Sequence, residues 1–257
     1  MGERPAYLGY NCEFNVSSFD KWEFENVEPK PFGEAEQEWL LKIIELAEES
    51  DTELVFFLVP YQMSLQAQEY IAYAKEMIAK YDIPVVDMFE LSDDVDINWR
   101  RDFSDYGHTN HFGAQKVTAY LGDFLKNNYD LQDYRGDERY ALWDLDLKTR
   151  QHEENNYRLQ QIADMELYFG ELSQLEDYTV VVSTTGEYLS ADANIESYLQ
   201  MLGPFHGFME GSKVWVIDNK ESIYESSGSE FLVNMPLSYG ELVLSGTSGN
   251  TSVLVDR

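Results

Sequence analysis

The sequence predicts an α/β protein, in which part of a doubly wound, flavodoxin-like parallel sheet is followed by a small α+β domain. Three observations support this prediction. Helical patterns alternate with short apolar runs before residue 130, strand-like runs dominate after residue 177, and a cluster of ionisable residues follows the second apolar run. Ligands bind at the carboxyl ends of the strands in doubly wound sheets, so we expect this cluster to carry the function.

The first predicted helix and strand follow an irregular, aromatic lead-in over residues 6 to 32. From Gly33 onwards, apolar residues recur at helical spacing; they are Trp39, Leu40, Ile43, Ile44, Leu46 and Ala47. Residues 53 to 60 then form a continuous apolar run that ends at Pro60. Such a run is typical of a central strand in a parallel sheet.

A second helix and a second strand complete the predicted half-sheet. Ser64 can cap a helix that ends near Tyr81. Residues 83 to 88 predict the next strand, and a loop then leads to a third helix from about Asn110 to Asn127. This order is half of a doubly wound sheet, in which the crossover connections are right-handed.

The second part of the chain predicts a separate module. We expect an α/β domain over residues 1–135, a connector with a long helix over 136–176 (the helix itself from about 151 to 175), and a small α+β module over 177–257. Within this module the patterns predict strands at 178–183, 213–218, 222–225, 241–245 and 252–255, and a helix at 191–202.

Composition excludes several classes of function. The 257 residues include 48 acidic and 18 basic side chains, which give a net charge of -30 that disfavours binding to nucleic acid or to anionic membranes. A single cysteine, Cys12, excludes an internal disulfide and a multi-cysteine zinc site. The sequence contains no apolar run long enough to span a membrane and no signal-peptide pattern at its start, so we expect a soluble protein without membrane insertion.

The ionisable cluster lies between Asp102 and Gly113. Asp105 and His108 are three residues apart, and Gly107 between them permits a tight turn. On such a turn the carboxylate can reach one ring nitrogen of the histidine and leave the other free as a general base. Thr109 or Asn110 would cap the next helix.

A metal site is the alternative use of the same cluster. Asp102, Asp105, His108 and His111 recur every three residues, and divalent cations accept such ligands. Gly107 and the helix start near Asn110 break the helical alignment that would bring all four together. We therefore expect His111 to be a surface residue in the first helical turn.

The motif Asp105-x-x-His108-x-Asn110-x-x-Gly113 resembles the last conserved block of the SGNH/GDSL-type hydrolases, and the resemblance extends over residues 6 to 128. It implies that Asp105 and His108 belong to a Ser-His-Asp triad for ester hydrolysis or O-acyl transfer, on a small acyl ester or an acylated cell-surface glycan. It implies no cofactor. Gly9 and Asn11 occupy about the place where the family carries a Gly-x-Asn that donates to the oxyanion.

The chain departs from that family in one respect that concerns the chemistry. The family's nucleophile lies in a Gly-Asp-Ser block after its first strand, and this sequence contains neither that block nor the first strands. Ser17 and Ser18 are possible substitutes, although nothing around them resembles a nucleophile elbow. Without a serine, the Asp–His pair can activate water but cannot use a covalent acyl intermediate.

Two further expectations concern partners and the second module. A half-sheet without its first strands exposes a strand edge and apolar surface, so we expect self-association or a partner domain that supplies the missing strands. A non-catalytic binding protein derived from a hydrolase is the alternative to an enzyme. Residues 177 to 257 resemble the ILEI/PANDER-type module, a resemblance that implies no catalytic residues.

Overall fold

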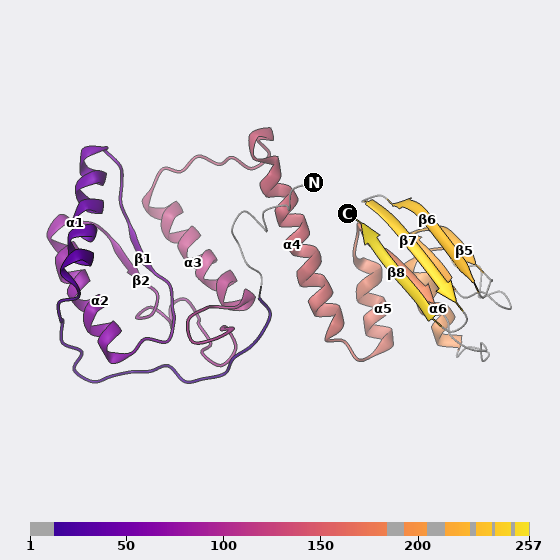
Figure 1. Cartoon of the computed structure of the whole chain (residues 1–257), viewed down its shortest axis with the longest axis horizontal. Coiled ribbons are helices and arrows are strands. Elements are labelled where there is room, and N and C mark those ends of the chain that lie inside the picture. The colour runs from indigo at the N-terminus through magenta and orange to yellow at the C-terminus, as the bar shows by residue number, and fades with distance from the viewer. Residues whose placement is uncertain are drawn as a thin grey trace. The chain divides into compact units, whose positions relative to one another are not determined.

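The computed structural model describes residues 13–183, 193–204, 214–226, 230–237, 240–247 and 250–256 (Figure 1). The chain divides into two compact units, residues 1–150 and 151–257. Both units combine helices with small sheets, so the predicted α/β class is confirmed in this general sense. None of the described helices is both long enough and apolar enough to cross a membrane.

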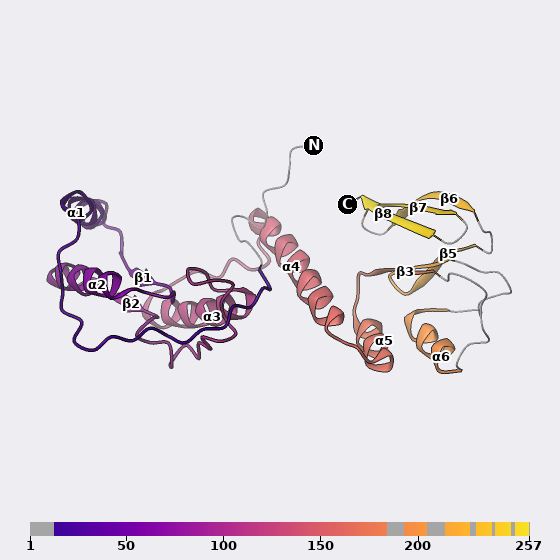
Figure 2. The same cartoon turned by 60° about the horizontal axis from the view of Figure 1, so that its bottom comes forward.

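Unit 1 is built around two short parallel strands. Its described elements are α1 (Glu34–Glu49), β1 (Phe56–Leu58), α2 (Leu65–Ile78), the short 3-10 helix η2 (Ala79–Tyr81), β2 (Val85–Asp87) and α3 (His111–Asn128). Strands β1 and β2 pair in parallel, with Phe57 opposite Val86. Helices α1 and α2 lie on one side of these strands and α3 lies on the other (Figures 1 and 2).

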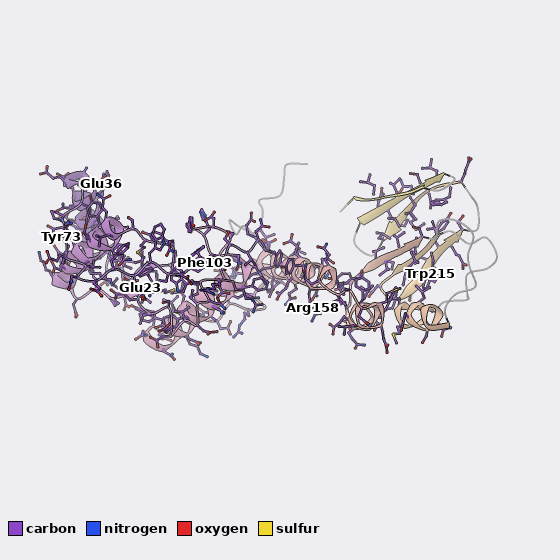
Figure 3. All side chains as sticks on the ribbon, turned by 90° about the horizontal axis from the view of Figure 1, so that it is seen from below. Glu23, Glu36, Tyr73, Phe103, Arg158 and Trp215 are labelled. Carbon is purple, nitrogen blue, oxygen red and sulfur yellow. The ribbon has the colours of Figure 1, made fainter. Side chains whose placement is uncertain are left out.

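The core of unit 1 lies between β2, the long segment after it, and α3. Its fully buried members are Val86, Met88, Val95, Ile97, Phe103 and Val117. Phe103, which is labelled in Figure 3, is 0% exposed and stacks on Trp99 with 4.8 Å between ring centroids. The aromatic lead-in covers this core, since Ser17 N donates to Phe103 O at 2.8 Å and the Phe19 ring packs on Phe103.

Helix α1 buries little of its apolar surface. Ile44 is 1% exposed, whereas Trp39, Ile43 and Leu46 are 64%, 47% and 64% exposed. The predicted apolar stripe of this helix is therefore largely open to solvent. Helix α2 begins as predicted, because the Ser64 hydroxyl accepts a hydrogen bond from Ala67 N at 3.2 Å.

The connector differs from its predicted form. The 3-10 helix η3 (Glu138–Tyr140) leads directly into α4 (Ala141–Gln160), which ends well before residue 175. A separate helix, α5 (Met165–Gln174), begins after Asp164, whose carboxylate accepts a hydrogen bond from Leu167 N at 2.9 Å. This aspartate cap interrupts what the sequence pattern suggested was one helix. The boundary between the two units falls within α4, after residue 150.

Unit 2 contains two three-stranded antiparallel sheets and a layer of helices. One sheet has the order β3-β4-β5, from β3 (Thr179–Ser183), β4 (Val214–Asp218) and β5 (Glu221–Ser226). The other has the order β6-β7-β8, from β6 (Phe231–Leu237), β7 (Gly240–Thr247) and β8 (Asn250–Asp256). Strand β6 was not predicted from the sequence, and the helix predicted at 191–202 is α6 (Ala193–Leu202).

Strand β4 forms the centre of unit 2 because both of its faces are buried. Trp215 and Ile217 belong to one core together with Leu172 of α5 and Leu199 of α6. Val214 and Val216 belong to a second core, shared with Leu242 and Leu244 of β7. The layers of unit 2 are therefore helices, the β3-β4-β5 sheet and the β6-β7-β8 sheet (Figure 2).

Candidate functional site

The candidate site is the pair formed by Asp105 and His108, in the segment between β2 and α3. Nδ1 of His108 lies 2.9 Å from Oδ1 and 3.0 Å from Oδ2 of Asp105. The hydrogen bond expected from their spacing is thus present. The two side chains are exposed, 78% for His108 and 60% for Asp105. With Nδ1 directed to the carboxylate, Nε2 is the ring nitrogen that remains to react.

A tight turn holds this pair in place. Oδ1 of Asp105 accepts hydrogen bonds from Gly107 N at 2.7 Å and from His108 N at 2.9 Å. The base of the turn is closed by Ser104 N, which donates to His108 O at 3.0 Å, next to an antiparallel bridge between Phe103 and Thr109. One carboxylate oxygen therefore fixes both the backbone of the turn and the ring of the histidine.

The same contacts set the electrostatics of Asp105. The N–H of Gly107 contributes most, followed by the hydrogen bond and the charge of His108, and together they lower the pKa of the Asp105 carboxyl. Asp105 is therefore ionised throughout the neutral range. An ionised carboxylate accepts the Nδ1 proton and favours the tautomer with a free lone pair on Nε2.

Asn110 anchors the residues that follow the turn. Its side-chain oxygen accepts hydrogen bonds from Phe112 N at 3.0 Å and Gly113 N at 3.2 Å, and so caps α3. Its side-chain nitrogen donates to Asn15 O at 3.0 Å and to Arg101 O at 2.7 Å. Asn110 is 1% exposed and thus ties the lead-in, the loop and the helix start together.

Gly113 and Asp102 form a second contact between the start of α3 and the loop before it. A Cβ atom on Gly113 would overlap the backbone carbonyl oxygen of Asp102, so the first turn of α3 can approach the loop only with glycine at this position. Asp102 is 0% exposed, and its Oδ2 accepts hydrogen bonds at 2.8 Å from both Asn98 N and Lys116 Nζ. Asp102 therefore stabilises the loop.

The prediction that His111 is a surface residue was wrong. His111 is 0% exposed and its backbone N–H donates to Glu13 O at 2.7 Å. The centroid of its ring lies 4.8 Å from that of the Phe14 ring. The lead-in covers the side chain. Asp102 and His111 are thus buried while Asp105 and His108 are exposed, and the described residues contain no group of three or more candidate ligands arranged to hold a metal. The four residues are therefore not arranged as the predicted metal site.

Neither of the two serines considered as nucleophiles forms a hydrogen bond with the ring of His108. The Ser17 hydroxyl donates to Ser104 O at 2.7 Å, and Ser18 is exposed. Over residues 13 to 183, no hydroxyl group forms a hydrogen bond with a ring nitrogen of His108. Gly9, Asn11 and Cys12 lie outside the described residues.

Aromatic side chains lie next to the pair. Tyr106, inside the turn, is 59% exposed, and Trp22 of the lead-in is 46% exposed. Their ring centroids are 5.9 Å apart, and the Phe19 ring lies 4.9 Å from that of Tyr106. The buried amide of Gln62 fixes this arrangement: Gln62 N donates to Tyr106 O at 2.7 Å, and its side-chain oxygen accepts from Trp22 N at 3.0 Å. This role of Gln62 was not predicted from the sequence.

A partly buried ion pair at the end of β2 was also not predicted. Lys75 Nζ lies 2.5 Å from Oδ2 of Asp87 and 2.7 Å from Oε2 of Glu90. Burial disfavours the charged form of Lys75, but the hydrogen bonds and charges of Asp87 and Glu90 outweigh it, so the pKa of Lys75 is raised. Two cavities of about 360 and 400 Å³ share these three residues, and neither is lined by Asp105 or His108.

Comparison of the chain with family models, with curated proteins and with solved structures found no match. The case for a function therefore rests on the geometry of the Asp105–His108 pair and on the fold that presents it.

Proposed function

We propose that unit 1 is part of an SGNH-type hydrolase or O-acyltransferase domain, in which His108 is the general base and Asp105 orients it. One observation carries this proposal. Both carboxylate oxygens of Asp105 lie within hydrogen-bond distance of Nδ1, at 2.9 and 3.0 Å, while the His108 side chain is 78% exposed. An oriented, accessible imidazole of this kind takes a proton from a hydroxyl group or from water.

The architecture supports the same proposal. The pair lies in the segment that follows β2, and Tyr106 O within its turn accepts a hydrogen bond from Gln62 N, four residues after the carboxyl end of β1. Helices lie on both sides of the sheet (Figure 2). Doubly wound sheets of the flavodoxin-like kind place their ligands at the carboxyl ends of the strands. The motif also divides into two exposed residues that can react and two buried residues, Asn110 and Gly113, that hold the loop against α3.

The described residues support hydrolysis by activated water. Nε2 of His108 takes a proton from water as the water oxygen bonds to the carbonyl carbon of the ester. The tetrahedral intermediate then breaks its bond to the leaving alkoxide, which receives the proton back from His108. Acyl transfer through a covalent intermediate requires a nucleophile in addition.

An acylated glycan is the substrate class that fits the surroundings best. Trp22 and Tyr106 expose 46% and 59% of their surface beside the catalytic turn. Flat aromatic rings with one apolar face and one polar group are suited to contact sugar rings. In this proposal the aromatic pair holds the sugar while His108 acts on its acyl ester.

A non-catalytic binding protein is the second candidate, favoured by the exposed apolar residues of α1. Unit 2 is proposed to be the separate ILEI/PANDER-like module, and we assign no catalytic residue to it. Its layered sheets and its own cores support an independent module.

The experiment that tests the proposal is hydrolysis of p-nitrophenyl acetate by the full chain. His108→Ala is expected to lower the rate by about 10²-fold or more, because a general base typically contributes 10²–10⁴-fold. Asp105→Asn is expected to lower it by about tenfold or more through loss of the orienting carboxylate. Asp94→Asn, which alters an exposed carboxylate in the same segment, is the control. Equal rates for the wild type and His108→Ala would contradict the proposal and favour the binding protein.

A further inference from the structure

Strand β1 has one edge without a backbone partner among the described residues. Phe56 N donates to Pro84 O at 3.0 Å, and Leu58 O accepts from Met88 N at 2.9 Å, so both residues direct their backbone groups towards β2. Backbone groups of successive residues in a strand point to opposite edges. The N–H and C=O of Phe57 therefore point away from β2, where a further strand could pair with them.

Apolar side chains on one face of β1 are exposed beside this open edge. Phe57 packs edge-to-face on Phe124 of α3, with 6.1 Å between ring centroids, but it remains 37% exposed. Val59, two residues further along the same face, is 51% exposed. A neighbouring strand would cover both side chains with its own. Strands of a parallel sheet are normally covered on both faces, so a pair as open as this is incomplete.

Helix α1, on the other side of the sheet from α3, also exposes apolar side chains. Trp39, Ile43 and Leu46 follow the i, i+4, i+7 spacing of one helix face and are 64%, 47% and 64% exposed. Figure 3 marks the start of this helix at Glu36. An apolar face of this size on a helix is normally packed against a sheet. Among the described residues, nothing covers these three side chains enough to remove them from solvent.

The handedness of the fold indicates where the missing element belongs. Helices α1 and α2 lie on the same side of the sheet (Figures 1 and 2). Right-handed crossovers with their helices on the same side of a sheet add successive strands in one direction, so the position beside β1 and away from β2 is the one that a further parallel strand of this fold would take. The open edge of Phe57 is on that side. The occupant that fits is therefore an extended segment parallel to β1.

Charge then selects the kind of segment. Between residues 34 and 53 the chain carries eight acidic residues and one basic residue, Lys42. Two copies of this surface would repel each other, whereas basic residues beside an apolar strand would be attracted. We propose that the free edge of β1 and the exposed face of α1 together dock an apolar β-strand of a polypeptide partner, flanked by basic residues and parallel to β1.

The test uses a short synthetic peptide with a central run of valine and isoleucine and lysines at both ends, titrated into the isotope-labelled full chain. We expect the peptide to protect the Phe57 amide from hydrogen exchange. A peptide with glutamates at both ends is expected to bind about tenfold more weakly or worse. N-methylation of alternate peptide amides should abolish binding when it blocks one edge of the peptide and spare it when it blocks the other.

Variants separate the proposed surface from general stickiness. Ile43→Ser is expected to weaken peptide binding by about tenfold, from the lost burial of one large aliphatic side chain. Leu145→Ser is the matched control, because Leu145 of α4 is 50% exposed and Ile43 is 47% exposed. The proposal is overturned if the peptide leaves Phe57 unprotected, if both N-methylated peptides bind equally, or if the chain dimerises through this edge and so protects Phe57 by itself.

Discussion

Gly113 in the first turn of α3 lies so close to Asp102 that a Cβ atom would overlap the backbone carbonyl oxygen of that residue. The absence of a side chain at this position lets α3 pack closely against the loop that carries Asp105 and His108. Gly113→Ala must push the helix and the loop apart, and we expect a loss of about 2–4 kcal/mol in the free energy of unfolding. Chemical denaturation measures this loss.

The same helix provides the control for that substitution. Gly122 is also in α3, but a Cβ atom there would meet nothing within 4 Å. Gly122→Ala should therefore stabilise the protein by about 0.5–1 kcal/mol through its better helix propensity. Equal effects of the two substitutions would show that the contact between Gly113 and Asp102 is not a constraint on the fold.

Asn110 makes two separable contributions, one through its oxygen and one through its nitrogen. Asn110→Asp keeps the acceptor for Phe112 N and Gly113 N but places a buried charge against the carbonyl groups of Asn15 and Arg101. We expect Asn110→Asp to cost about 2 kcal/mol or more in unfolding free energy at neutral pH. Acidification that protonates the new carboxyl should reduce this cost, as denaturation at several pH values would show. A cost independent of pH would contradict the role given to the side-chain nitrogen.

The Lys75–Asp87 pair provides a third test. Lys75→Met leaves Asp87, whose side chain is 7% exposed, with its backbone donors alone, and we expect a loss of about 1–3 kcal/mol in unfolding free energy. Lys42→Met is the control; Lys42 pairs with Glu38 at 3.9 Å on the surface, and such pairs contribute about 0–1 kcal/mol.

The pH dependence of that difference has a definite sign. The pKa of Lys75 is raised in the folded state, so its contribution is complete below the unfolded pKa of lysine, about 10.4, and is lost as pH rises through the folded value. The stability difference between the wild type and Lys75→Met should therefore stay constant at neutral pH and shrink above about pH 10.4. A difference that instead disappears on mild acidification would contradict this account.

The Asp105 carboxyl should titrate below the ordinary value for aspartic acid, about 3.9. The N–H of Gly107 is the main cause and His108 the next. The interaction is therefore present above the ordinary pKa and lost as pH falls through the folded value. In His108→Ala the midpoint should rise but remain below the ordinary value, because the bond from Gly107 persists. Carbon-13 NMR of the carboxyl group measures both midpoints, and a wild-type midpoint at or above the ordinary value would contradict the geometry.

Local rules were sufficient for the parts of the molecule that depend on neighbours in sequence. Ser64 and Asn110 cap their helices, and Asp105 reaches His108 over a spacing of three. These features depend on backbone turns of a few residues, whose chemistry is visible in the residue types.

Features that depend on distant segments could not be predicted. His111 is buried because Glu13 and Phe14 of the lead-in cover it. Trp39 is exposed although its spacing suits a buried helix face, because spacing does not reveal whether a partner strand is present. The helix expected over residues 151 to 175 was misjudged for a third reason, since the aspartate cap at Asp164 starts a new helix where polarity alone suggested continuity.

The central claim is that Asp105 fixes the tautomer of His108 so that Nε2 is the free base. Long-range proton–nitrogen NMR of the His108 ring, above the pH at which it loses its charge, tests this claim most directly. We expect a protonated Nδ1 and an unprotonated Nε2 in the wild type, with loss of this preference in Asp105→Asn. A wild-type ring with its proton on Nε2 would contradict the account.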